Sequence, residues 1–228
     1  MIVAIHQPQY LPWLGYFDKM DQSDVFVLLD DVQYKKNEWQ NRNKIRNADT
    51  WQWLTVPVLY QFGQPINQVE IDNTTNWSDK HIKSIEINYS KAPHFEEHAA
   101  FFEETFKREW PLLEQINSHF IQYLKRALGI KARIVKSSTM DLETSGTQRL
   151  VDICSRLDAD VYLSGAGGRD YLEEDLFSGS GIELKFQSYR HPEYEQVYEG
   201  FEPYMSVIDL LFTSGSKSID IIREGREK

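Results

Sequence analysis

The first 46 residues show the clearest pattern of hydrophobic and polar segments in the chain. Apolar runs at 2–5 and 25–29 predict two buried strands, and apolar residues at helical spacing between them predict a helix over 13–22. This order of strand, helix and strand is typical of a parallel βαβ unit. Polar residues follow both strands, so they would lie at the carboxyl edge of the sheet, where open α/β sheets bind their ligands.

The same alternation returns in the second half of the chain and predicts an α/β fold. Further strands are predicted at 51–58, 67–71, 132–137, 160–163 and 183–186, and further helices at 79–89, 95–109, 112–128, 147–157, 206–212 and 218–224. We expect one domain over 1–228 with a mainly parallel, Rossmann-like sheet and helices on both faces. Three consecutive helices make 77–128 a helical insertion or lid, and the segment 33–46, which lacks apolar periodicity, is predicted as a long loop.

Composition narrows the class of protein. The 228 residues are 41% hydrophobic and 13% aromatic, which is enough for a packed core. The net charge of −10 argues against broad nucleic-acid binding. No apolar stretch reaches the length of a membrane span, and no basic leader precedes the first apolar run. We therefore expect a soluble cytoplasmic protein with no nucleic-acid or membrane partner, in which the single Cys154 is a packing residue.

His6 and Gln7 form the first candidate corner, directly after the first strand. A histidine changes charge near neutral pH, so His6 can bind an anion or act as acid or base. The alternative is a backbone hydrogen bond at a tight corner. Gly15 would let the helix backbone approach either a neighbouring strand or a phosphate.

The second strand ends at Asp30 and Asp31. Paired carboxylates there can hold a divalent cation or a ribose hydroxyl, although Asp is also common in turns and at helix N-caps. A local cationic patch follows within 35–46, in which Asn41 and Arg42 are the best candidates to bind an anion and Lys35 and Lys36 are expected to be bystanders. A solvated charged loop is the alternative for the whole patch.

The sequence SGAGGRDY at 164–171 is the second strong feature. Its glycines follow a predicted strand and can form an anion cradle of backbone N–H groups, with Arg169 next to it. It is neither a P-loop nor a dinucleotide fingerprint. His191 begins a third polar loop after a strand. His94 and His98 stand four residues apart, but no further ligand pattern accompanies them, so no metal site is predicted.

Five motifs carry a resemblance to a known family. The segments HQPQYLPWLGYFDKM, LDDVQY, WQNRNKIR, YLSGAGGRDYL and FEPYMSVIDLLF are similar to those of the WbqC-like protein family, over nearly the whole chain except GSKSIDIIREGREK at 215–228. The resemblance implies a role in surface-polysaccharide and O-antigen biosynthesis, by transfer of an aminoacyl or acyl group to an amino sugar.

A more distant likeness concerns the fold alone. The opening strand, corner and helix resemble those of HIGH-motif nucleotidylyltransferases, with Gly15 at the glycine of that motif. Trp13 and Tyr16 would replace its histidines, which removes the residues of standard adenylyl transfer.

These observations lead to three hypotheses about function. The first is amide formation on a nucleotide-linked amino sugar, the second an ATP-dependent activating enzyme of the nucleotidylyltransferase type, and the third a non-catalytic binding or scaffold protein of the glycan machinery. ATP with Mg²⁺ is the candidate cofactor, and a nucleotide sugar or activated acyl donor is the expected small-molecule partner. We assign His6 as general base and Arg169 as a catalytic cation. The predicted substrate-binding residues are Gln7, Tyr10, Trp13, Gly15, Asp30, Asp31, Gln33, Asn41, Arg42, Lys44, Ser164, Gly165, Gly167, Gly168, Tyr171 and His191.

Overall fold

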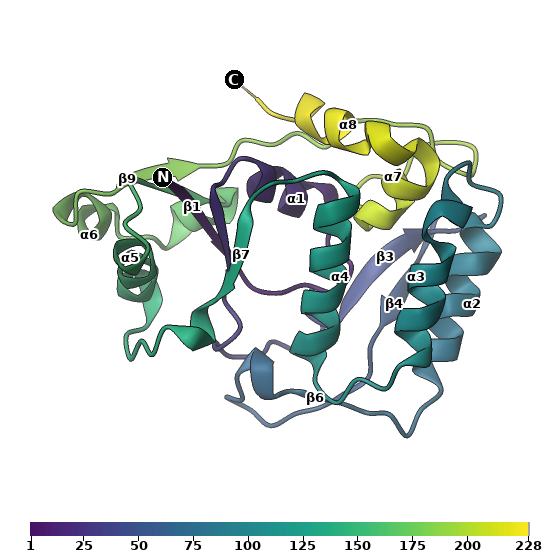
Figure 1. Cartoon of the computed structure of the whole chain (residues 1–228), viewed down its shortest axis with the longest axis horizontal. Coiled ribbons are helices and arrows are strands. Elements are labelled where there is room, and N and C mark those ends of the chain that lie inside the picture. The colour runs from purple at the N-terminus through teal and green to yellow at the C-terminus, as the bar shows by residue number, and fades with distance from the viewer. Residues whose placement is uncertain (228) are drawn as a thin grey trace.

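The computed structural model describes residues 1–227 and has an all-parallel five-stranded sheet at its centre (Figure 1). The strands are β1 (Ile2–His6), β2 (Val25–Leu28), β7 (Arg133–Lys136), β8 (Val161–Ser164) and β9 (Glu183–Phe186), in the spatial order β7-β2-β1-β8-β9. Each coincides with a strand predicted from an apolar run. The expected Rossmann-like α/β sheet is therefore confirmed.

Helices cover both faces of this sheet, as predicted. They are α1 (Leu14–Asp21), α2 (Trp77–Tyr89), α3 (Phe95–Lys107), α4 (Leu113–Ala127), α5 (Gly146–Arg156), α6 (Glu174–Gly179), α7 (Val207–Ser214) and α8 (Ser218–Glu224). On one face, Val3 and Val27 belong to a core with α5 and α6, in which Cys154 is buried as a packing residue. On the other face, Ala4 and Phe26 belong to a core shared with α1, α4, α7 and α8. Within residues 1–227, no helix has the length and apolar content needed to cross a bilayer.

Helices α2, α3 and α4 occupy the segment that the sequence predicts as an insertion or lid. In Figure 1, α2 and α3 lie at the end of the molecule opposite α5 and α6, with α4 between them and the sheet. Buried aromatic residues of the three helices, among them Tyr89, Phe102 and Phe120, share one continuous core with Ala4 of the central strand. The assignment of 1–228 to one domain with an insertion stays a prediction.

Two short hairpins differ from the sequence prediction. The segment expected as a loop over 33–46 ends in β3 (Arg42–Arg46), which pairs antiparallel with β4 (Trp51–Thr55). One inward-facing position of β3 is occupied by Asn43 rather than by an apolar residue, so the sequence does not show the apolar–polar alternation of a strand. The Asn43 side-chain amide instead donates a hydrogen bond to the Leu11 carbonyl at 2.7 Å. The strand expected at 67–71 is reduced to β6 (Glu70–Ile71), which pairs with β5 (Val58–Leu59) after a 3₁₀ turn at Ile66–Gln68.

Helix α1 is enclosed on all sides, because every residue from Leu14 to Met20 is buried. Two of those residues, Asp18 and Lys19, are charged and are 0% and 3% exposed. The Asp18 carboxylate accepts hydrogen bonds from Nε of Arg226 at 2.6 Å, and from the side-chain amides of Gln187 at 2.6 Å and Gln22 at 2.7 Å. The loop after β9 and the segment after α8 are thereby held against α1.

A second buried carboxylate holds α7 in place. Asp209 accepts the hydroxyl groups of Tyr89 and Tyr194, each at 2.8 Å, and the amide of Gln196 at 2.9 Å. Burial raises the pKa of Asp209 above its ordinary value. These bonds connect α7 to α2 and to the segment that follows β9.

Replacing Asp18 by alanine is expected to lower the free energy of unfolding by about 1–3 kcal/mol, because it removes a fully buried acceptor of three hydrogen bonds, while the Arg226 guanidinium keeps its contact with Asp21 and the Gln187 amide keeps the Gly15 carbonyl. Urea unfolding followed by circular dichroism measures the loss. Asp220→Ala is the matched control, since that carboxylate is 75% exposed and 3.7 Å from its partner. Equal stability of the two variants would contradict the role given to Asp18.

Candidate functional site

The carboxyl ends of β1 and β8 border a cavity of about 510 Å³. The chain leads from β1 to β2 on one side of the sheet, and from β8 to β9 on the other. The cavity therefore lies at the topological switch point, where open parallel sheets bind their ligands.

Part of its wall consists of residues predicted from the sequence. These are His6, Gln7, Ser164, Gly165, Gly167, Gly168 and Tyr171. The fold thus brings together the corner after β1 and the glycine-rich loop after β8, although His6 and Ser164 are 158 positions apart in the sequence.

Three cationic side chains, Lys19, Lys35 and Arg149, also line the cavity, whereas no aspartate or glutamate of the described chain does. Lys35 was expected to be a bystander, and Lys19 and Arg149 were not predicted as site residues. Arg149 is paired with Asp31 behind the wall, but no carboxylate of the described chain lines the cavity, so its wall carries net positive charge and favours an anionic ligand.

Lys19 is the most unusual group in the cavity. Its Nζ donates to the Ile5 carbonyl at 3.0 Å and, among residues 1–227, forms no ion pair. Burial lowers the pKa of Lys19 from 10.5 to about 7, so the amine is divided between its charged and neutral forms near neutral pH. A Cβ atom on Gly165 would lie 3.8 Å from Nζ, which places the amine beside the glycine-rich loop.

His6, the last residue of β1, is held in its neutral form. Burial and the nearby Lys19 charge lower the pKa of His6 to about 3, against the smaller opposing effect of its hydrogen bond to Gln7. Its Nδ1 lies 3.1 Å from the Gln7 carbonyl oxygen, which can only accept. Nδ1 therefore carries the proton, and Nε2 is the acceptor of the ring.

The glycine-rich loop forms a 3₁₀ turn at Ala166–Asp170, stabilised by a bond from the Gly168 N–H to the Gly165 carbonyl at 2.9 Å. A Cβ atom at Gly168 would lie 2.9 Å from Leu172 Cδ1 and overlap Ser164 Oγ. Only glycine fits there without displacing its neighbours. Within the described chain, no backbone acceptor takes the N–H of Gly167, which lines the cavity.

Asp30 and Asp31 serve the site indirectly. Asp30 is 1% exposed and accepts bonds from the Ser138 N–H at 3.0 Å and Oγ at 2.7 Å, which joins the ends of β2 and β7. Asp31 pairs with Arg149 and accepts the Ser137 hydroxyl at 2.6 Å. The two carboxylates thus fix the strand ends and position Arg149. No group of three or more His, Cys, Asp or Glu side chains in residues 1–227 is arranged to hold a metal ion.

The remaining predicted residues lie outside the cavity wall. They are Tyr10, Trp13, Gly15, Gln33, Asn41, Arg42, Lys44, Arg169 and His191, besides the two aspartates. Tyr10 is fully buried and bonded to His81 at 2.8 Å, and Asn41 donates to the Val56 carbonyl at 2.9 Å. Gln33 forms an isolated bridge with Pro65. Arg169 is exposed and lies 4.3 Å above the Phe186 ring.

Trp13 and His191 pack against each other, with ring planes 16° apart. Gly15 faces this Trp13 indole, which a Cβ atom would overlap. The close approach expected at Gly15 is therefore made by a side chain two residues earlier, rather than by a strand or phosphate.

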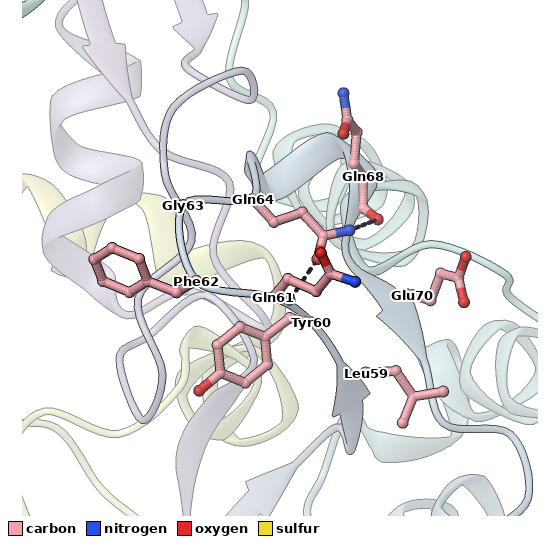
Figure 2. A pocket seen from close by; sticks show the side chains of 8 residues that line it. All are labelled: Leu59, Tyr60, Gln61, Phe62, Gly63, Gln64, Gln68 and Glu70. Atoms are coloured by element: carbon pink, nitrogen blue, oxygen red, sulfur yellow. Dashed lines mark hydrogen bonds between the residues drawn. The ribbon is translucent and has the colours of Figure 1, made fainter.

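A second hollow, of about 600 Å³, lies at the turn between β5 and β6 (Figure 2). Its turn is closed by bonds from the Gln61 N–H to Gln64 and from the Gln64 amide to the Gln68 carbonyl, at 2.8 and 2.6 Å. Phe62 lines the hollow and is 96% exposed. No convergent cations or perturbed bases line this hollow, so the sheet edge is the better candidate site.

Comparison with known proteins supports the resemblance carried by the motifs. The profile described as the WbqC-like protein family matches residues 7–221. The chain belongs to the WbqC-like protein family. The matched residues include 215–221, the first half of the C-terminal segment that the five motifs do not cover. Over 229 residues, the chain is 37% identical to the uncharacterized protein Rv1507c of Mycobacterium tuberculosis (strain ATCC 25618 / H37Rv), covering 99% of each chain. No solved structure matches.

The buried amine of this WbqC-like protein predicts a pH dependence of stability. An unfolded chain keeps the Lys19 proton up to about pH 10.5, whereas the folded chain releases it near 7. Between these values the unfolded state binds more protons, so the free energy of unfolding rises with pH, by on the order of 1 kcal/mol per pH unit from this group.

The expectation is tested by urea unfolding at pH 7, 8 and 9. Lys19→Met should remove most of the rise, while Lys83→Met, at an exposed position of α2, should leave it unchanged. Parallel curves for wild type and Lys19→Met would show that the amine titrates normally.

Proposed function

We propose that this protein is a transferase of bacterial surface-polysaccharide precursor biosynthesis, which joins an activated aminoacyl or acyl group to a nucleotide-linked amino sugar through an amide bond. Membership of the WbqC-like family supports the biological setting. The observation that carries the proposal is the cavity wall, which combines the cations Lys35 and Arg149 with two groups, His6 and Lys19, that can accept a hydrogen bond or a proton at neutral pH.

Arg149 and Lys35 are proposed to bind the phosphate of the nucleotide-linked substrate. Arg149 is fixed for this role because its Nη1 donates to the Leu142 and Thr144 carbonyls at 2.8 and 2.9 Å. The Gly167 N–H adds a neutral donor beside these charges. Such preorganised donors stabilise charge that develops on the acyl oxygen during the reaction.

Lys19 is proposed as the proton acceptor. The sugar amine attacks the acyl carbonyl carbon, a C–N bond forms, and the bond to the leaving phosphate or thiol breaks with its electron pair. The proton lost from the nitrogen passes to the neutral Lys19 amine, whose pKa near 7 suits this transfer better than the pKa of about 3 of His6. His6 then orients the sugar amine by accepting a hydrogen bond at Nε2. Arg169, which is exposed and lies over the Phe186 ring, has no part in the proposed reaction.

Mass spectrometry tests the reaction. Purified protein is incubated with UDP- or dTDP-linked amino sugars and with acyl-CoA, or with ATP, Mg²⁺ and amino acids, and the acylated sugar nucleotide is quantified. We expect Lys19→Met to lower kcat by about 10²-fold or more, because base catalysis contributes rate enhancements of that order.

Matched variants separate chemistry from folding. Lys36→Met and Arg169→Ala, both outside the cavity wall, should retain wild-type kcat. Wild-type turnover by Lys19→Met would reject its role as base. Pyrophosphate release from ATP without any amine acceptor would instead identify an activating enzyme, and the absence of product from every combination would reject transfer.

A further inference from the structure

The outward face of the β3–β4 hairpin combines tryptophans with cations. In the antiparallel register Lys44 is opposite Trp53, so the two side chains project from the same face. The Lys44 ammonium lies 4.0 Å from the Trp51 ring centroid, and the Arg42 guanidinium lies 4.3 Å from that of Trp53. Each cation covers one indole face, which fixes the orientation of the ring.

A cleft of about 270 Å³ opens beside these stacked groups. It is lined by Asn37, Glu38, Trp39, Arg42, Lys44 and Trp53. The centroids of the Trp39 and Trp53 rings are 5.6 Å apart and their planes are inclined by 47°, so the two indoles form a wedge. The tryptophans remain 37% and 36% exposed.

Positive charge at the cleft exceeds negative charge among the described residues, since Arg42 and Lys44 line it together with one carboxylate, Glu38, with which neither forms an ion pair. Neither Arg42 nor Lys44 forms an ion pair, whereas other cations of the chain, such as Arg149, Arg223 and Arg226, do. In a chain with a net charge of −10, two such cations beside exposed indoles favour an anionic ligand with a flat apolar face.

The wedge and its polar groups distinguish between two ligand classes. Two indoles inclined by 47° cannot both stack on a flat nucleobase placed between them. A pyranose ring packs the C–H groups of one face on a single indole, and its hydroxyls need both donors and acceptors. Asn37 and Glu38 supply acceptors, and Lys44 and Arg42, whose Nη2 also donates to the Asn37 carbonyl, supply charged donors for an anionic group.

We propose that the Trp39–Trp53 cleft binds an acidic saccharide, a sugar that carries a carboxylate or phosphate. One sugar unit stacks on an indole while its anionic group lies between Arg42 and Lys44. This proposal does not depend on the acyl-transfer reaction.

The cleft is connected to the cavity by one short segment. The Trp39 carbonyl accepts the Tyr10 N–H at 3.0 Å, and the Gln40 amide donates to the Gln7 side chain at 2.7 Å. Lys35, on the same segment, lines the cavity. A saccharide held in the cleft is therefore bound by the chain segment that also forms part of the cavity wall.

A glycan array of uronate-, sialate- and phosphosugar-bearing oligosaccharides, with neutral counterparts, provides the test. The strongest ligand is then titrated by calorimetry against wild type, Trp39→Ala and Lys44→Met. We expect each variant to weaken binding at least tenfold, with unchanged circular dichroism. Phe62→Ala and Lys83→Met, which remove an exposed aromatic and an exposed lysine elsewhere, should bind as wild type.

Three results would overturn the proposal. The first is no binding of any acidic glycan, or equal binding of neutral ones. The second is binding that survives both cleft variants but is lost in Lys19→Met, which would move the ligand to the cavity. The third is binding of a single-stranded (dT)₁₀ oligonucleotide in preference to every glycan, which would assign the cleft to nucleotides.

Discussion

The burial of α1 is the constraint on which the rest of the structure depends. A helix enclosed on every side can contain charged residues only where the surrounding protein supplies hydrogen bonds or opposite charges. Asp18 receives both, from Arg226 and Gln187. The next residue, Lys19, receives one carbonyl oxygen and no carboxylate within the described chain. Two neighbouring charges on one helix thus have opposite consequences, since the first joins distant segments and the second yields a readily deprotonated amine.

The geometry of the sheet explains where that amine lies. All five strands end at the same edge, and the change in chain direction between β1 and β8 leaves space there that no connection fills. Asp30 and Asp31 hold the ends of β2 and β7 through serine hydroxyls. The ion pair with Asp31 neutralises part of the Arg149 charge, so the excess positive charge on the cavity wall comes mainly from Lys19 and Lys35.

Sequence reasoning identified the architecture well because apolar runs report burial directly. It also identified the corner at His6 and the loop at 164–171, since both follow such runs. It missed Lys19 and Arg149, because a lysine or arginine in a helix is normally solvated, and the groups that surround these two come from segments distant in the sequence. Helical spacing offered one weak signal for Lys19, which lies next to the apolar positions of α1.

The β3 strand shows the same limit in another form. Its inward position Asn43 is polar and its outward positions carry charge, so no local pattern distinguishes it from a loop. Its pairing with β4 decides the structure. The same pairing places Arg42 and Lys44 beside tryptophans that the sequence prediction had assigned to separate elements.

The strand order has a consequence for how the molecule is made. The central strand β1 pairs with β2, 22 residues later, but its other edge waits for β8, whose Val161 pairs with Ile2. During synthesis, β1 therefore exposes one row of unpaired backbone groups until more than a hundred further residues have emerged. The contact between Asp18 and Arg226 forms later still, because it spans 208 positions. Such long loops must close before their contacts contribute, so the pairing of β1, rather than the formation of the helices, is expected to limit the rate of folding.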